Sequence, residues 1–423
     1  MEIYRNRINK YIIIYYAILL LIMAIRTSMS APNAIIRLVY LLAFFIPIVF
    51  KYTKLYLPCV VIFMTVCTYN FAFGYLPYDI SAYFYITLVS WIITTATNTK
   101  KLANISTLFF VVLYYVGSIN ILYGGSLSHA FYGMAAVAIG MLITGNDIRF
   151  NRFAMLNCFS IISLVLSAIY LYNYESFLET YSQVDGQERS GWNDPNYFSC
   201  VIGAGVVTSL ILLLKERNST IFIKIFWIIT IVVSFVAQAL LASRGGVLSV
   251  GVTALILIIF SNIGKFYKVI LVLLISIFII VLYTNDYFEL LLYRIENDTS
   301  GGSGRIDIWN LKISTFISDG NVFSWLFGVG HDQAVKLGTS SGAIGFHNDY
   351  LAILCGYGIV GLLTFVYLLF VRPFRYIYND RTTVLALVIY LAVTCFTLEP
   401  ISSGRITFIG FYALILICSK VKE

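Results

Sequence analysis

The feature that most constrains this chain is a series of about fourteen apolar runs, most of them long enough to cross a lipid bilayer. A membrane-spanning helix needs roughly 17–25 apolar residues, and a helix satisfies its own backbone hydrogen bonds in hydrocarbon. Only 11% of the residues are charged, against about 25% in soluble domains. We therefore expect an all-α, polytopic integral membrane protein with about 14 (12–14) transmembrane helices, forming a single membrane domain over residues 1–423.

The expected spans, with boundaries uncertain by a few residues, are 11–25, 34–50, 55–73, 80–97, 103–123, 128–144, 152–173, 195–214, 219–240, 246–261, 264–283, 347–371, 381–397 and 401–419.

The charges between these runs indicate which side of the membrane each loop occupies. With the N-terminus placed in the cytoplasm, 19 of the 28 lysines and arginines fall inside, and 15 of the 20 acidic residues fall outside. Positively charged residues favour the cytoplasmic side of short loops. The bias predicts that both termini are cytoplasmic and that the longest polar segment, residues 284–346, is extracytoplasmic. The basic residues form no cluster, so the net charge of +8 indicates no nucleic-acid partner.

The large extracytoplasmic loop, residues 284–346, is the polar centre of an otherwise apolar chain. A loop of this length is more often functional than idle. Apolar residues recur within it at helical spacing, at Ile306, Trp309, Ile313, Phe316 and Ile317. The spacing predicts an amphipathic helix that either rests on the membrane surface or covers the ends of the bundle.

Three arginines stand at the predicted outer rim. Arg244 lies in a tight turn before two glycines, Arg305 follows a Gly-Gly-Ser-Gly run, and Arg189 lies in an acidic loop. Arg244 is explained either as a residue that extends to the interface from a helix end or as a fixed cation whose planar fork suits phosphate oxygens. Arg305 either follows a flexible turn or provides a second pyrophosphate contact at a helix N-terminus.

His347 opens an apolar run directly after the large loop, and Asn348 and Asp349 follow it. The histidine either caps a helix or serves as a general base, since neutral imidazole suits that role near pH 7. The pair His331 and Asp332 has no further metal ligand at useful spacing. The sequence therefore predicts no metal site and no cofactor.

Several short motifs occur in a fixed order along the second half of the chain. They are Asp194-Pro195-Asn196-Tyr197-Phe198, Ser243-Arg244-Gly245, Gly304-Arg305 with Trp309, and His347-Asn348-Asp349-Tyr350-Leu351 followed by Gly356-Tyr357-Gly358-Ile359-Val360-Gly361. In this order, and with the large loop before the histidine, they resemble the O-antigen polymerase and O-antigen ligase superfamily. The resemblance covers roughly residues 189–361, and the first half of the chain matches only as a run of membrane helices.

The resemblance implies a GT-C-like membrane glycosyltransferase that uses sugars linked to undecaprenyl pyrophosphate and needs no metal. It implies pyrophosphate-binding roles for Arg244 and Arg305 and a catalytic role for His347. Arg189, Asp194 and Asn348 follow as candidates for contact with the substrate. Attack by the acceptor hydroxyl opposite the leaving group would invert the anomeric centre.

The function expected first is polymerisation of lipid-linked repeat units of O-antigen, capsule or exopolysaccharide. The alternative is a ligase that transfers the glycan to lipid A core or another acceptor, and a lipid-oligosaccharide flippase is the third possibility. A flippase is disfavoured because the predicted spans hold almost no ionisable residue. The expected location is the bacterial inner membrane, with the active site extracytoplasmic. The expected partners are the lipid-linked oligosaccharide, the bilayer, a chain-length regulator and a flippase.

Overall fold

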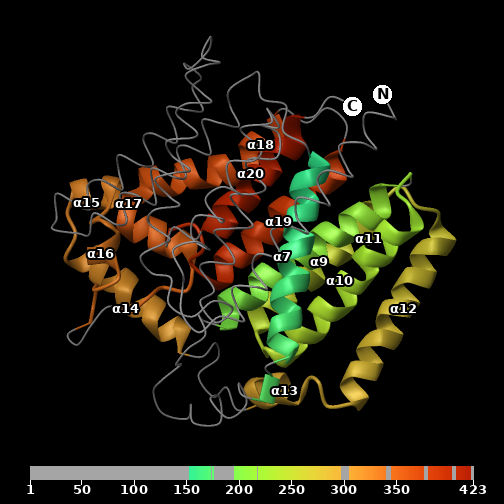
Figure 1. Ribbon diagram of the computed structural model, residues 1–423. Helices are drawn as coiled ribbons and strands as arrows, with labels where there is room; N and C mark the ends of the chain where they lie inside the picture. The colour runs from blue at the N-terminus through green and yellow to red at the C-terminus, as the bar shows by residue number, and fades with distance from the viewer. Residues whose placement is uncertain are drawn as a thin grey trace, which may run out of the picture.

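A computed structural model describes residues 152–172, 174–175, 195–216, 218–296, 304–339, 344–375, 380–402 and 406–420. Within these ranges the protein is all-helical, and five helices are long and apolar enough to cross a membrane. Figure 1 shows them as a bundle with a group of short helices at one side. The six spans expected before residue 151 lie outside the described residues, as do Arg189 and Asp194.

Helix α9, Pro195–Lys215, is the most enclosed of the long apolar helices, with 89% of its apolar window buried. It packs against α7, Arg152–Tyr172, α10, Ile221–Leu240, and α11, Arg244–Phe260. Small residues permit this close approach. A Cβ atom on Gly205 would lie 2.0 Å from the Cβ of Ser163, whose hydroxyl donates to the Ile202 carbonyl at 2.7 Å.

Helix α19, Arg381–Thr397, packs against α11 and α20, Ile406–Lys420. The hydroxyl of its buried Tyr390 donates to the Cys200 carbonyl of α9, and its ring lies 5.2 Å from that of Phe411. These contacts join the last two helices to the centre of the bundle.

Helix α17, Asp349–Val366, continues through the π-helical turn η4, Tyr367–Val371, into α18, Arg372–Arg375. It is kinked at Gly358, whose φ of 71° is costly for any residue with a Cβ atom. The kink makes the carbonyls of Cys355 and Gly356 available to other donors. The backbone N–H groups of Val329 and Gly330 bind them at 3.0 and 2.9 Å, which fastens the large loop to this helix.

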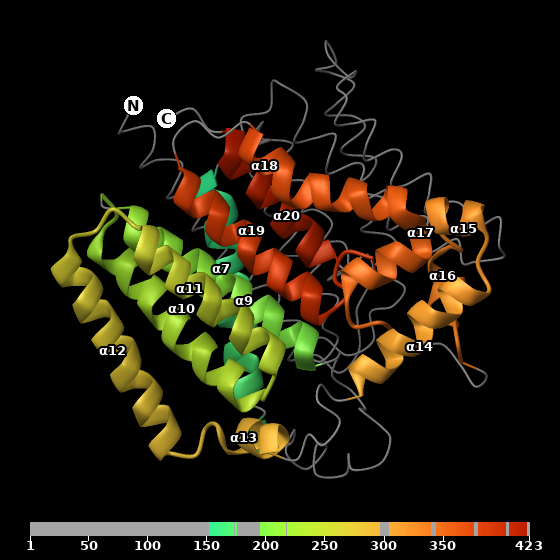
Figure 2. The same ribbon diagram turned by 180° about the vertical axis from the view of Figure 1, so that it is seen from behind.

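The large loop contains four short helices in its described part. They are α13, Glu289–Glu296, α14, Arg305–Ser318, α15, Val322–Phe327, and α16, His331–Ala334. Figure 2 shows α14, α15 and α16 gathered beside one end of α17, and each contacts that helix. The predicted helix over 306–317 is therefore present, and it covers part of the bundle.

Helix α12, Lys265–Thr284, lies at the margin of the bundle in both views (Figures 1 and 2). Its mean hydropathy is 2.7 and only 6% of its apolar window is buried. A helix that is apolar on all sides and so little covered is suited to contact with lipid.

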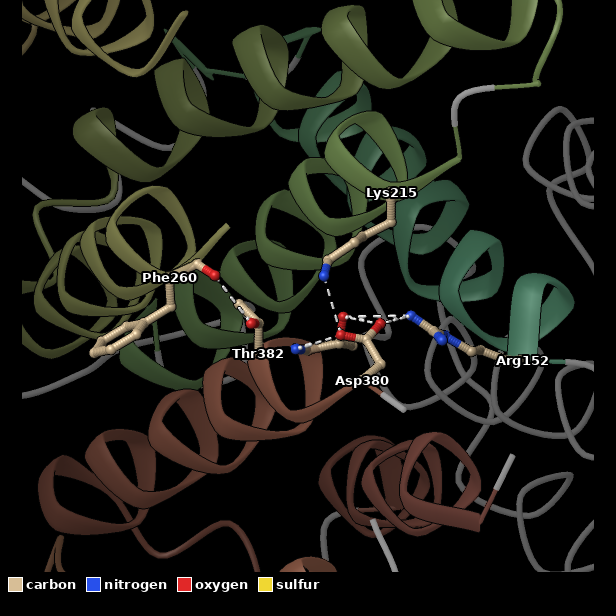
Figure 3. A network of polar contacts seen from close by, with 6 residues as sticks. Arg152, Lys215, Phe260, Asp380 and Thr382 are labelled. Atoms are coloured by element: carbon tan, nitrogen blue, oxygen red, sulfur yellow. Dashed lines mark hydrogen bonds and ion pairs between the residues drawn. The ribbon is translucent and has the colours of Figure 1, made fainter. Parts of the chain in front are cut away.

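A carboxylate network joins α7, α9 and the start of α19 (Figure 3). Asp380 pairs with Arg152 of α7 and, at 3.1 Å, with Lys215 of α9, and its side chain caps α19 through the Thr383 N–H. Burial acts to raise the pKa of Asp380, but the charge of Arg152 and the contacts of Thr383 and Lys215 outweigh it and lower the pKa to about 2. The network joins three helices at the end predicted to be cytoplasmic.

Candidate functional site

Arg244 is held in a short turn between α10 and α11. Ser243 caps α11, its hydroxyl accepting from the Gly246 N–H at 3.3 Å, and Arg244 is the first residue of the helix. Gly245 lies against the end of α19, where a Cβ atom added to it would be 2.7 Å from the Thr397 hydroxyl. The glycine after Arg244 therefore permits a close approach between the turn and Thr397.

Arg305 reaches the same residue from the large loop. It is the first residue of α14 and follows Gly304, whose φ of 73° lies in the left-handed region that favours glycine. Its Nη1 donates to the Thr397 carbonyl at 2.9 Å. The turn that carries Arg244 and the side chain of Arg305 thus meet at the C-terminal end of α19, although they are far apart in the sequence.

His347 stands between the large loop and α17 in an uncommon backbone conformation, with φ of 50°. Its backbone N–H donates to the carboxylate of Glu399. The indole N–H of Trp309 donates at 2.6 Å to the carbonyl of the preceding residue, Phe346, so α14 bears directly on the histidine segment. Non-glycine residues in the left-handed region often mark functional sites.

Asn348 has a structural role beside this histidine. It is the N-cap residue of α17, and its side-chain oxygen accepts from the Leu351 N–H at 3.2 Å. The side chain is buried, and the cap fixes where the helix begins immediately after His347. Contact between Asn348 and substrate stays a prediction.

Residues 398–402 form hydrogen bonds with Asp349, the first residue of α17. The Asp349 N–H donates to the Leu398 carbonyl at 3.0 Å, and its carboxylate accepts from the N–H groups of Ile401 and Ser402 at 2.9 and 2.7 Å. Asp349 is completely buried. These bonds hold residues 401 and 402 in a turn, so the helix expected from residue 401 is not formed at these two positions.

Glu399 is a residue of this site that the sequence interpretation did not single out. It is 5% exposed, its N–H donates to the Tyr197 hydroxyl at 3.2 Å, and its carboxylate accepts from His347. Burial raises its pKa to about 7, against the opposing effects of the His347 N–H and Lys312. One signal was available: Glu399 is the only acidic residue between 381 and 420, and an isolated carboxylate between apolar runs is costly unless it has a role.

Lys312 is a second polar residue of this region whose burial the helical spacing over 306–317 did not predict. In the sequence Lys312 stands between Trp309 and Ile313, two apolar positions of this helix, and in the structure it is fully buried. Its Nζ donates to the carbonyls of Val335 at 2.8 Å and of Ala334 and Leu337 at 3.4 Å, and lies 4.8 Å from the centre of the Phe346 ring. Burial lowers its pKa. Lys312 holds the segment after α16 against α14 and next to the histidine segment.

A family model described as Wzy_C: O-Antigen ligase matches residues 229–366. Over these residues the chain is similar to the O-antigen ligase family. The match spans Arg244, Arg305 and His347, and it supports placing the chain in the O-antigen ligase and polymerase superfamily. This family implies a glycosyl-transferring enzyme of the polymerase or ligase type that acts on polyprenyl-linked glycans. No curated protein and no solved structure matches the chain.

The described part of this site has no metal cluster. Among the described residues, no group of three His, Cys, Asp or Glu side chains could hold an ion. The described cysteines are buried and unbridged. The polar groups that converge here are arginines, a histidine, a lysine and carboxylates, a set that can bind an anion and move a proton.

Proposed function

We propose that this protein is an inverting glycosyltransferase that polymerises undecaprenyl-pyrophosphate-linked oligosaccharide repeat units on the extracytoplasmic face of the membrane. The observation that carries the proposal is the meeting of the Arg244 turn and the Arg305 side chain at Thr397. Each arginine is also the first residue of a helix, where the backbone dipole adds positive potential.

The arginines would bind the pyrophosphate of the donor. Guanidinium groups form paired hydrogen bonds with phosphate oxygens and keep their charge at any physiological pH. As the bond between the anomeric carbon and pyrophosphate breaks, negative charge grows on the leaving oxygen. Two fixed cations stabilise that charge and so lower the barrier to its departure.

His347 would activate the acceptor. Its imidazole takes the proton of an acceptor sugar hydroxyl as that oxygen attacks the anomeric carbon, and lipid pyrophosphate leaves from the opposite face. The bonds from His347 to Glu399 and from Trp309 to Phe346 hold the N–H and the carbonyl of the peptide unit that joins Phe346 to His347. Proton transfer depends on such fixed geometry, because the base must lie within about 3 Å of the hydroxyl.

Transfer of a finished glycan to lipid A core or another acceptor is the second candidate. The description of the matching family as O-antigen ligase favours it. The same donor chemistry serves both reactions, and the acceptor alone separates them.

Analysis of lipid-linked glycans after deletion of the gene tests this assignment. A polymerase predicts that the deletion strain accumulates single repeat units and loses long chains, and that the wild-type gene restores them. Long chains that accumulate on the carrier lipid would contradict polymerisation and establish the ligase. An unchanged glycan profile would contradict both.

A further inference from the structure

A cavity of about 810 Å³ lies outside the arginine and histidine site, between the ends of α10 and α12 and helix α13. Four tyrosines line it: Tyr174, Tyr283, Tyr287 and Tyr293. We call this cavity the tyrosine pocket. A tyrosine presents a flat apolar face and a hydroxyl that can donate or accept, which suits a ligand whose rings have both C–H faces and hydroxyl groups.

The charge of the tyrosine pocket is opposite to that of the arginine site. Asp286, Glu289 and Glu296 line it, and none of its described lining residues is a lysine or an arginine. Carboxylates accept hydrogen bonds from hydroxyl and amine groups and repel phosphate. The pocket therefore suits the sugar part of a lipid-linked glycan and disfavours the pyrophosphate part.

The backbone around the tyrosine pocket is fixed. The Tyr287 N–H donates to the Leu282 carbonyl at 3.1 Å, which closes the turn after α12. Phe288 and Leu291 pack with Ala239 and Ala242 in one apolar cluster. Burial raises the pKa of Tyr174, and the charge of Glu289 adds to the rise, so the carboxylate of Glu289 lies near enough to act on this tyrosine.

The tyrosine pocket adjoins the proposed pyrophosphate site. Leu240 lines the pocket and ends α10, four residues before Arg244, and Ala242 of the turn between them packs with Phe288 and Leu291 beside the pocket. Figures 1 and 2 both show α13 below the same end of the bundle as the α10–α11 turn. A glycan attached to a pyrophosphate at Arg244 therefore has its first sugars within reach of the tyrosines.

We propose that the tyrosine pocket is a glycan subsite that binds uncharged or amine-bearing sugars of the lipid-linked substrate. This inference rests on the proposed function. Tyrosines at a membrane interface also form aromatic belts that contact lipid headgroups. A belt gives no reason for tyrosines and carboxylates to converge on one cavity, and it predicts no sugar binding.

Binding of a soluble oligosaccharide to the full-length protein in lipid nanodiscs tests the proposal. The probe is the oligosaccharide released by mild acid from the host's lipid-linked glycan, so it carries neither lipid nor pyrophosphate. Its dissociation constant is measured by titration, and saturation-transfer NMR identifies the sugar protons that contact the protein. Undecaprenyl pyrophosphate without sugar is titrated in parallel.

Tyr287→Ala should weaken oligosaccharide binding by about fivefold, the usual worth of one aromatic contact, and Glu289→Gln should weaken it by removing a charged acceptor. Tyr287→Phe, which keeps the ring and the packing, should retain most of the affinity. The matched control is Tyr267→Ala, which removes an exposed tyrosine at the other end of α12. None of these variants should change binding of the sugar-free carrier.

Equal oligosaccharide affinity in wild type, Tyr287→Ala and Glu289→Gln would overturn the inference, as would an equal loss in Tyr267→Ala. Wild-type protein that binds no oligosaccharide would also overturn it. Each of these results leaves the proposed function intact, because that function is judged by the glycans of the deletion strain and by the arginine and histidine variants.

Discussion

Replacing Glu399 with glutamine should remove a pH dependence of stability that the fold imposes. The carboxyl pKa rises from 4.5 to about 7 in the folded protein, with burial as the largest cause. Because the folded state favours the protonated form, its stabilising contribution is complete below pH 4.5 and is lost as pH rises through about 7. At roughly 1.36 kcal/mol per pKa unit, wild type should lose about 3 kcal/mol across this interval.

Glutamine keeps a carbonyl oxygen that can accept from His347 and cannot ionise. The assay is the midpoint of thermal unfolding of both proteins in the same detergent, measured from pH 4.5 to 8.5. Glu399→Gln should resemble wild type at the acid end and unfold at a higher temperature than wild type at the alkaline end. Glu296→Gln, which changes an exposed carboxylate, is the control and should follow wild type throughout. A difference that is constant with pH, or that grows towards acid, would refute the reasoning.

Three further predictions concern the residues around the arginines and the histidine. Arg244→Lys and Arg305→Lys should each lose most turnover at normal protein level, because lysine keeps the charge and loses the planar fork; full turnover in both would leave them as surface cations. Gly245→Ala should lower turnover, since its Cβ would lie 2.7 Å from the Thr397 hydroxyl and 2.8 Å from the Thr397 Cβ, and adding Thr397→Gly, which removes both atoms, should restore part of it; no restoration would show that this contact is unimportant. Asn348→Ala should lower stability by about 1 kcal/mol through loss of the α17 cap, measured by thermal unfolding, and an unchanged midpoint would contradict the capping role.

Much of the fold follows from hydrophobic pattern, because a span in lipid must be apolar and continuous. All eight runs expected after residue 151 are helices, and most begin and end within a few residues of the predicted limits. The exception is the run expected over residues 401–419, because its first two residues are not helical. The Asp349 carboxylate holds the N–H groups of Ile401 and Ser402, so these residues form a turn and the helix begins later. A bond between residues so far apart has no signature in local periodicity.

The candidate site was less predictable than the helices. Motif and residue type pointed to Arg244, Arg305 and His347, but nothing in their spacing placed the turn after Arg244 and the side chain of Arg305 against Thr397. Glu399 escaped notice because a single carboxylate between apolar runs has no motif, and only the folded chain places it on the His347 backbone.

The helical spacing over 306–317 predicted α14 correctly but not which face is buried. Lys312 is buried because three carbonyls, one from the last residue of α16 and two from the segment after it, accept hydrogen bonds from its ammonium group. These acceptors come from the tertiary fold, so the periodicity of α14 alone could not place Lys312 inside.

The most direct test of the account is turnover per folded protein for His347→Gln and His347→Ala. Purified wild type and variants, matched by thermal unfolding and by size-exclusion profile, are given the lipid-linked repeat unit, and the rate of chain extension is measured. If His347 takes the acceptor proton, Ala should reduce the rate by roughly 10²–10⁴-fold, and Gln, which can hydrogen-bond but cannot take a proton, should fail nearly as badly. Binding of sugar-free undecaprenyl pyrophosphate should stay close to wild type in both, because the arginines supply that contact. Near-normal turnover in His347→Gln would contradict the account and remove histidine from the reaction.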